Sequence, residues 1–96
     1  MNENVEQWNI SKNAVSSEKG LVASQHWLAS SVGADALNKG GNAIDAAIAC
    51  AFALNVVEPW MCGLGGSGYI LIWLAKTKEM KVIDFQGILP KSISFE

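Results

Sequence analysis

The sequence predicts an α+β fold in which two helices are followed by a glycine loop and a β-hairpin. Three observations support this order. Apolar residues recur at helical spacing over residues 27–39, and residues 43–54 form an almost wholly apolar run. Two further apolar stretches, 69–74 and 81–85, flank the polar turn 76–79. Such a pair of stretches is typical of two antiparallel strands.

The first helix is predicted from Leu28, Val32 and Ala36, which fall at intervals of four and share one helix face. The pair Gly40-Gly41 ends it, because glycine readily takes the left-handed conformation that closes a helix. Before the helix, the apolar stretch 21–23 predicts a short strand.

The second helix is the clearest element of the sequence. Asn42 is a favourable N-cap, and Asp45 lies at the third helical position, near the positive end of the helix dipole. The run is apolar on every side, so we expect it to be buried on all sides. It is shorter than the roughly 20 apolar residues needed to cross a bilayer. Its many alanines allow other elements to approach closely, and Glu58-Pro59 ends the segment.

The composition indicates a piece of something larger. Hydrophobic residues make up 50% of the 96 residues and charged residues 17%, whereas about 25% of a typical domain is charged. The first strand, over 69–74, is expected to be buried on both faces. Residues 1–20 have no periodicity and are interpreted as an extended N-terminal arm, which leaves 21–96 as an incomplete domain.

Charge and cysteine content exclude several functions. The net charge is −2 and all seven cations are lysines, so there is no basic stripe for nucleic acid. Cys50 and Cys62 form neither a disulfide framework nor a zinc set, and we expect no metal and no cofactor. The polar N-terminus lacks the apolar segment of a signal peptide, which favours a cytoplasmic location.

The glycine loop matches a nucleotide-binding fingerprint only in its letters. Gly63, Gly65 and Gly68 satisfy G-x-G-x-x-G, but that motif needs a strand before the loop and a helix after it. The predicted order here is the reverse. The glycines are therefore interpreted as permitting tight backbone geometry and close passage of neighbouring segments.

No side chain of the sequence stands out as catalytic. His26 is the only histidine and follows Ser24 by two residues, but a nucleophile–base pair needs a third orienting group that the pattern does not supply. His26 is interpreted as a surface or packing residue. Cys50 lies among alanines as an inert core thiol, and Cys62, beside the glycine loop, is only slightly more plausible as a nucleophile.

The end of the second strand is a place where functional groups are often displayed. Asp84 needs a partner there, either a backbone turn or a neighbouring segment. Gln86 follows at the strand end, where it can hydrogen-bond to a ligand but supplies no charge. A solvated strand end is at least as compatible with the spacing.

Residues 20–90 resemble the start of the γ-glutamyltransferase family. The resemblance is carried by VASQH at 22–26, GGNAIDAA at 40–47, VVEPWMCGLGGSGY at 56–69 and Asp84-Phe85. It implies an N-terminal-nucleophile hydrolase with an αββα sandwich, of which this chain is a partial piece from the start of the large subunit. It further implies a proenzyme that cuts itself, a threonine nucleophile outside this segment, and transfer of a γ-glutamyl group to water or an amine.

The resemblance assigns one substrate-binding position to this chain, and the residue there departs from the family pattern. An arginine that holds the α-carboxylate of the γ-glutamyl group follows Asp-Phe in the family, and this chain has Gln86 instead. Glutamine lacks the charged fork of arginine. Three interpretations remain open: a γ-glutamyltransferase with another carboxylate anchor, an amidohydrolase or acylase with a different acyl donor, and a truncated packing fragment. Expected partners are the rest of the large subunit, the small subunit released by autocleavage, and an amide substrate.

Overall fold

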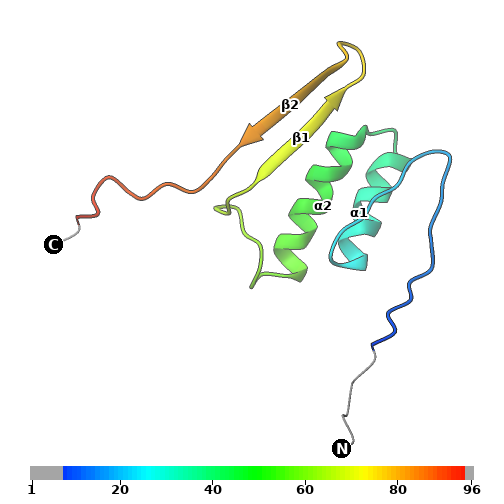
Figure 1. Ribbon diagram of the computed structural model, residues 1–96, viewed down its shortest axis with the longest axis horizontal. Helices are drawn as coiled ribbons and strands as arrows, with labels where there is room; N and C mark the ends of the chain where they lie inside the picture. Colours follow the sequence, from blue (N-terminus) through cyan, green and yellow to red (C-terminus); the bar gives the residue numbers. More distant parts are fainter. Residues whose placement is uncertain (1–7, 95–96) are drawn as a thin grey trace, which may run out of the picture.

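A computed structural model describes residues 8–94 and contains the four predicted elements (Figure 1). They are α1 (Trp27–Asn38), α2 (Ala43–Val57), β1 (Tyr69–Leu74) and β2 (Glu79–Asp84). Their order confirms the prediction of two helices, a glycine loop and a hairpin. None of the helices in the described part is long and apolar enough to span a membrane.

The glycine pair ends α1, as predicted. The Gly41 N–H donates to the Ala36 carbonyl over 2.9 Å, and the Gly40 N–H donates to the Leu37 carbonyl over 3.0 Å. These two bonds form a Schellman motif, which satisfies carbonyls that the last helical turn leaves free. Gly40 has a φ of 93°, a backbone conformation that is strained for residues other than glycine.

A capping box begins α2. The Asn42 Oδ1 accepts the Asp45 N–H and the Asp45 Oδ2 accepts the Asn42 N–H, each over 2.9 Å. The helix continues to Val57, three residues beyond the predicted end at 54. It stops there because Pro59 disfavours the helical conformation at Glu58, whose φ and ψ are −131° and 58°.

The two helices pack side by side (Figure 1), and the residues buried on them are small. Ala29 and Gly33 of α1 and Ala46 and Cys50 of α2 are buried. No large side chain is fully buried in the described part of the chain. The small residues bring the helices close together, but they remove little apolar area from water.

The prediction of a strand over 21–23 is wrong. The sheet described has two strands, β1 and β2, so this segment has no strand to pair with. Residues 21–24 instead run extended against the helices and border a hollow of about 370 Å³ over alanines of α2. The close approach to alanines that the sequence suggested is thus made by this segment.

The hairpin β1–β2 is antiparallel, with Tyr69 opposite Asp84 at its open end and Leu74 opposite Glu79 at its turn. Lys78 completes the turn with a φ of 53°. The turn is complete at Lys78, so β2 begins at Glu79 and ends at Asp84. The sequence had predicted this strand over 81–85.

In this chain by itself, α2 and β1 are largely exposed. An apolar stripe along α2, spaced by four residues, is 37–78% exposed; it consists of Ile44, Ile48, Phe52 and Val56. Most side chains of β1 are exposed as well. The accessible surface is 8999 Å², whereas a compact chain of this mass exposes roughly 5,300 Å². The burial expected from composition therefore requires surfaces that this chain does not contain.

Candidate functional site

The glycine loop starts at a well-defined turn after α2. The Glu58 carbonyl accepts the N–H groups of Met61 and Cys62, each over 3.0 Å. The Glu58 side chain is itself buried, and its Oε2 has no hydrogen-bond partner in the described part of the chain. The carbonyl bonds fix the direction in which the chain leaves the helix.

The end of the loop lies against Phe85, the residue that follows β2. The Phe85 N–H donates to the Gly68 carbonyl over 3.1 Å, which adds one backbone bond beyond the last strand pair. The Phe85 ring lies directly on Gly68, where a Cβ would stand 2.7 Å from the ring Cζ. Between α2 and the loop lies an open hollow of about 330 Å³, which Phe85 and Cys62 also line.

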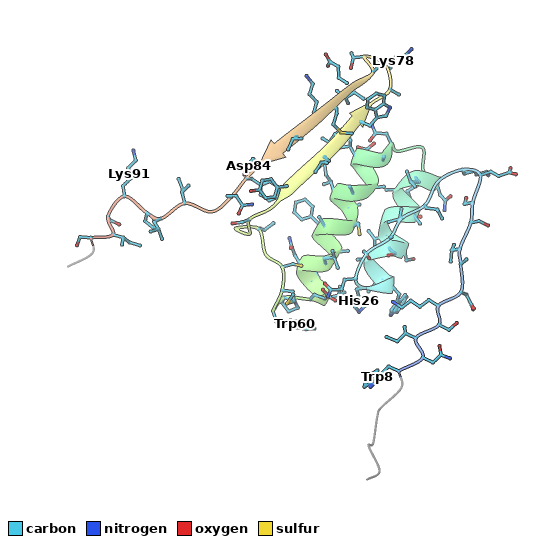
Figure 2. All side chains as sticks on the ribbon, viewed as in Figure 1. Trp8, His26, Trp60, Lys78, Asp84 and Lys91 are labelled. Atoms are coloured by element: carbon cyan, nitrogen blue, oxygen red, sulfur yellow. The ribbon has the colours of Figure 1, made fainter. Side chains whose placement is uncertain are left out.

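Gln86 lies at this junction, exposed to solvent. Its Nε2 donates to the Gly68 carbonyl over 3.4 Å, and its backbone N–H donates to Asp84 Oδ1 over 3.3 Å. Asp84, labelled in Figure 2 where the hairpin ends, therefore caps the backbone turn that leads into Gln86. The position can present a neutral amide to a ligand, and its assignment as the substrate-binding position stays a prediction.

Ser67 is the residue of this region that sequence reasoning missed. Its Oγ accepts the Gly87 N–H over 2.7 Å, so it ties down the residue that follows Gln86. The one available signal was a hydroxyl in a loop composed mostly of glycines. That signal does not identify the partner, because Gly87 is 20 residues away in the sequence.

The glycine loop is not a nucleotide-binding loop of the dinucleotide type. It follows α2 and precedes β1, the order expected from the sequence, so no helix N-terminus faces the loop from its far end. In addition, no group of three or more metal-ligating side chains occurs among residues 8–94.

His26 and Ser24 do not form a nucleophile–base pair. The His26 Nδ1 accepts the Leu28 N–H over 3.1 Å and so caps α1, and its ring stacks on Trp27 with centroids 6.0 Å apart. The Ser24 hydroxyl bonds to the His26 backbone carbonyl and lies 2.6 Å from the Ser30 hydroxyl. Both residues thus organise the start of α1, in agreement with the structural interpretation of His26.

The two cysteines differ as expected. Cys50 is buried between the helices, and Cys62 is half-buried at the hollow beside the glycine loop. Both are free thiols. Among the described contacts, neither thiol has a neighbouring base or cation.

Residues 29–96 match the family model described as Gamma-glutamyltranspeptidase. This match covers most of the chain, including α2, the glycine loop, the hairpin and Gln86. The chain belongs to the γ-glutamyltranspeptidase family. The expectation drawn from the sequence motifs is confirmed.

The curated relatives that this chain matches include glutathione hydrolases and acylases. The chain is 58% identical over 71 residues to a glutathione hydrolase proenzyme of Bacillus subtilis subsp. natto, covering 74% of this chain and 12% of the relative. It is 45% identical over 85 residues to the acylase ACY 1 proenzyme of Pseudomonas sp. strain SE83, covering 88% of this chain and 15% of the relative. The chain thus spans only a small part of the length of the curated relatives it matches.

Solved structures of two transpeptidases contain the same arrangement. The enzyme of Helicobacter pylori matches with a TM-score of 0.77 and 41% identity, over 86% of this chain and 24% of that one. The transpeptidase CapD of Bacillus anthracis matches with a TM-score of 0.73 and 32% identity, over 83% of this chain and 27% of CapD. The two helices and the hairpin are therefore a partial piece of the N-terminal-nucleophile hydrolase fold.

Proposed function

We propose that this chain contributes to an enzyme that transfers or hydrolyses a γ-glutamyl or related acyl group of an amide. The observation that carries the proposal is the 58% identity to a glutathione hydrolase proenzyme over 71 residues, 74% of this chain. The chain supplies structural elements and the strand end with Gln86. The nucleophile, a threonine, belongs to a part of the protein outside these 96 residues.

The reaction proceeds in two steps. The threonine hydroxyl attacks the amide carbonyl, the amine leaves with a proton, and an ester-linked acyl-enzyme remains. Water or a second amine then attacks the ester and regenerates the hydroxyl. Because the threonine becomes available only as a chain terminus, the proenzyme first cleaves itself, and the resulting small subunit packs against the large subunit that contains α1 to β2.

Gln86 favours a second candidate within this class, an acylase-type hydrolase with a different acyl donor. A carboxylate buried against glutamine lacks the charged, two-pronged partner that arginine offers, which costs on the order of 1–3 kcal/mol. The 45% identity to an acylase ACY 1 proenzyme supports this alternative. A donor whose acyl group lacks an α-carboxylate would fit a neutral amide better.

Substrate competition in the full-length protein tests the proposal. We expect an intact mass spectrum with two subunits, and hydrolysis of γ-glutamyl anilides or of acyl amides without the carboxylate. Gln86→Arg should raise kcat/KM for γ-glutamyl donors about tenfold over acyl donors. Gln25→Arg, an equal change of charge at another exposed glutamine, is the control. A single uncleaved chain that turns over neither substrate would contradict the proposed function, and equal effects of the two variants would contradict the role of Gln86.

A further inference from the structure

The segment after β2 is held on the glycine loop by bonds on both sides of Gln86. Before it, the Phe85 N–H reaches the Gly68 carbonyl over 3.1 Å. After it, the Gly87 N–H reaches the Ser67 Oγ over 2.7 Å. The second bond uses a side-chain hydroxyl where a backbone carbonyl would continue an ordinary strand ladder, so a single side chain holds the peptide after Gln86 on the loop.

Gly87 and Ser67 fit each other sterically as well. A Cβ at Gly87 would stand 2.8 Å from the Ser67 Oγ, closer than real Cβ atoms approach other heavy atoms. The backbone of Gly87 is not in the positive-φ region that favours glycine. A side chain at position 87 would therefore displace the Ser67 hydroxyl from its bond, although the backbone conformation itself does not need glycine.

We propose that Ser67 is a positioning residue for Gln86. By holding the peptide that follows Gln86, the Ser67 hydroxyl fixes the direction from which the Gln86 amide meets the acyl donor. This inference rests on the proposed function, in which Gln86 contacts that donor. Since Gln86 is exposed and has a long side chain, a fixed backbone reduces the conformational freedom that substrate binding would otherwise remove.

Kinetics of the full-length protein with its best amide donor test the proposal. Ser67→Ala should raise KM about fivefold with little change in kcat, the effect of losing about one hydrogen bond. Ser67→Thr keeps the hydroxyl and should restore KM. Ser31→Ala, on the exposed side of α1, is the matched control and should behave as wild type. Thermal midpoints of all variants show whether each one is folded.

Two double variants separate positioning from general structural support. In the Gln86→Ala background, Ser67→Ala should have no further effect on KM, because the group that it positions is gone. Gly87→Ala alone should raise KM, because its Cβ would clash with the Ser67 Oγ. In the Ser67→Ala background, where that oxygen is absent, Gly87→Ala should cause no further rise in KM.

The outcomes are distinguishable. An active wild type in which Ser67→Ala leaves KM unchanged, or raises it equally with and without Gln86, overturns the positioning role and leaves the proposed function standing. A full-length wild type that cleaves neither γ-glutamyl nor other acyl amides overturns both.

Discussion

Gly33 of α1 and Ala46 of α2 bring the two helices into backbone contact. A Cβ at Gly33 would stand 3.1 Å from the Ala46 carbonyl oxygen and 2.8 Å from Val22 Cγ1. The helix pair and the extended segment before it thus meet at one point, and that point has no room for a side chain. This close packing explains why α1 contains a glycine at position 33, although glycine inside a helix lowers the stability of the helix.

Gly33→Ala should destabilise the full-length protein by about 1–3 kcal/mol, the usual cost of inserting a methyl group into a packed interface. Thermal unfolding midpoints measure the effect. Gly65→Ala is the matched control, because a Cβ there meets no atom within 4 Å. Equal midpoints for the two variants would show that α1 and α2 can separate at no cost.

Asn42→Ala should weaken the first turn of α2 by about 1 kcal/mol, since an N-cap acceptor is lost and the Asp45 N–H is left without its bond. Hydrogen exchange of the peptide that contains this turn should become about fivefold faster. Asn42→Ser retains an acceptor and should exchange at nearly the original rate. Exchange that is unaffected by the alanine would argue that packing, and not the capping box, fixes this end.

Lys39 provides a pH-dependent contact. Its ammonium lies 2.6 Å from the Asp35 carboxylate, and the hydrogen bond and opposite charge raise its pKa above the ordinary 10.5. Because the raised pKa belongs to the folded state, the pair stabilises the fold below pH 10.5 and loses this effect as the pH rises through the folded-state pKa. The stabilisation is small, since both side chains are exposed.

An NMR titration of the lysine side chains measures this effect. Asp35→Asn should shift the Lys39 pKa back toward 10.5. A titration that is identical with and without the Asp35 carboxylate would mean that the contact is not maintained in solution.

The 96-residue chain expressed alone should behave as a loosely packed protein. Its buried core consists of small residues, while Phe52 and Val56 of α2 are 59% and 78% exposed. We expect retained helical circular dichroism, binding of the dye ANS and a broad thermal transition. The full-length protein is the control and should show little ANS binding. A sharp, cooperative transition without dye binding in the isolated chain would refute this expectation.

Local signals in the sequence predicted the elements well because their causes are local. Gly40 and Asn42 act within one or two turns of the helices that they end or begin, and both act as predicted. The last three residues of α2 lay outside the predicted run, since Val56 and Val57 are compatible with either helix or strand and only Pro59 further on ends the helix.

The candidate site was less predictable because it depends on contacts across the hairpin. Gln86 could be singled out only through the family resemblance, as nothing in its spacing distinguishes it from a solvated strand end. Ser67 could not be linked to Gly87 without the pairing of Tyr69 with Asp84. The sequence could not show what covers α2, because an apolar pattern shows that a face requires cover, but not which chain segment supplies it.

The separation of the chain into two local pairs has a consequence for how fast this region assembles. α1 and α2 contact each other, as do β1 and β2, but the backbones of the helical pair and the hairpin hardly approach one another. Contacts between neighbours in sequence close short loops and form within about 10 µs. Few contacts within this chain fix the orientation of the helix pair relative to the hairpin. We therefore expect the slow step for this region to be its packing against parts of the protein outside these 96 residues.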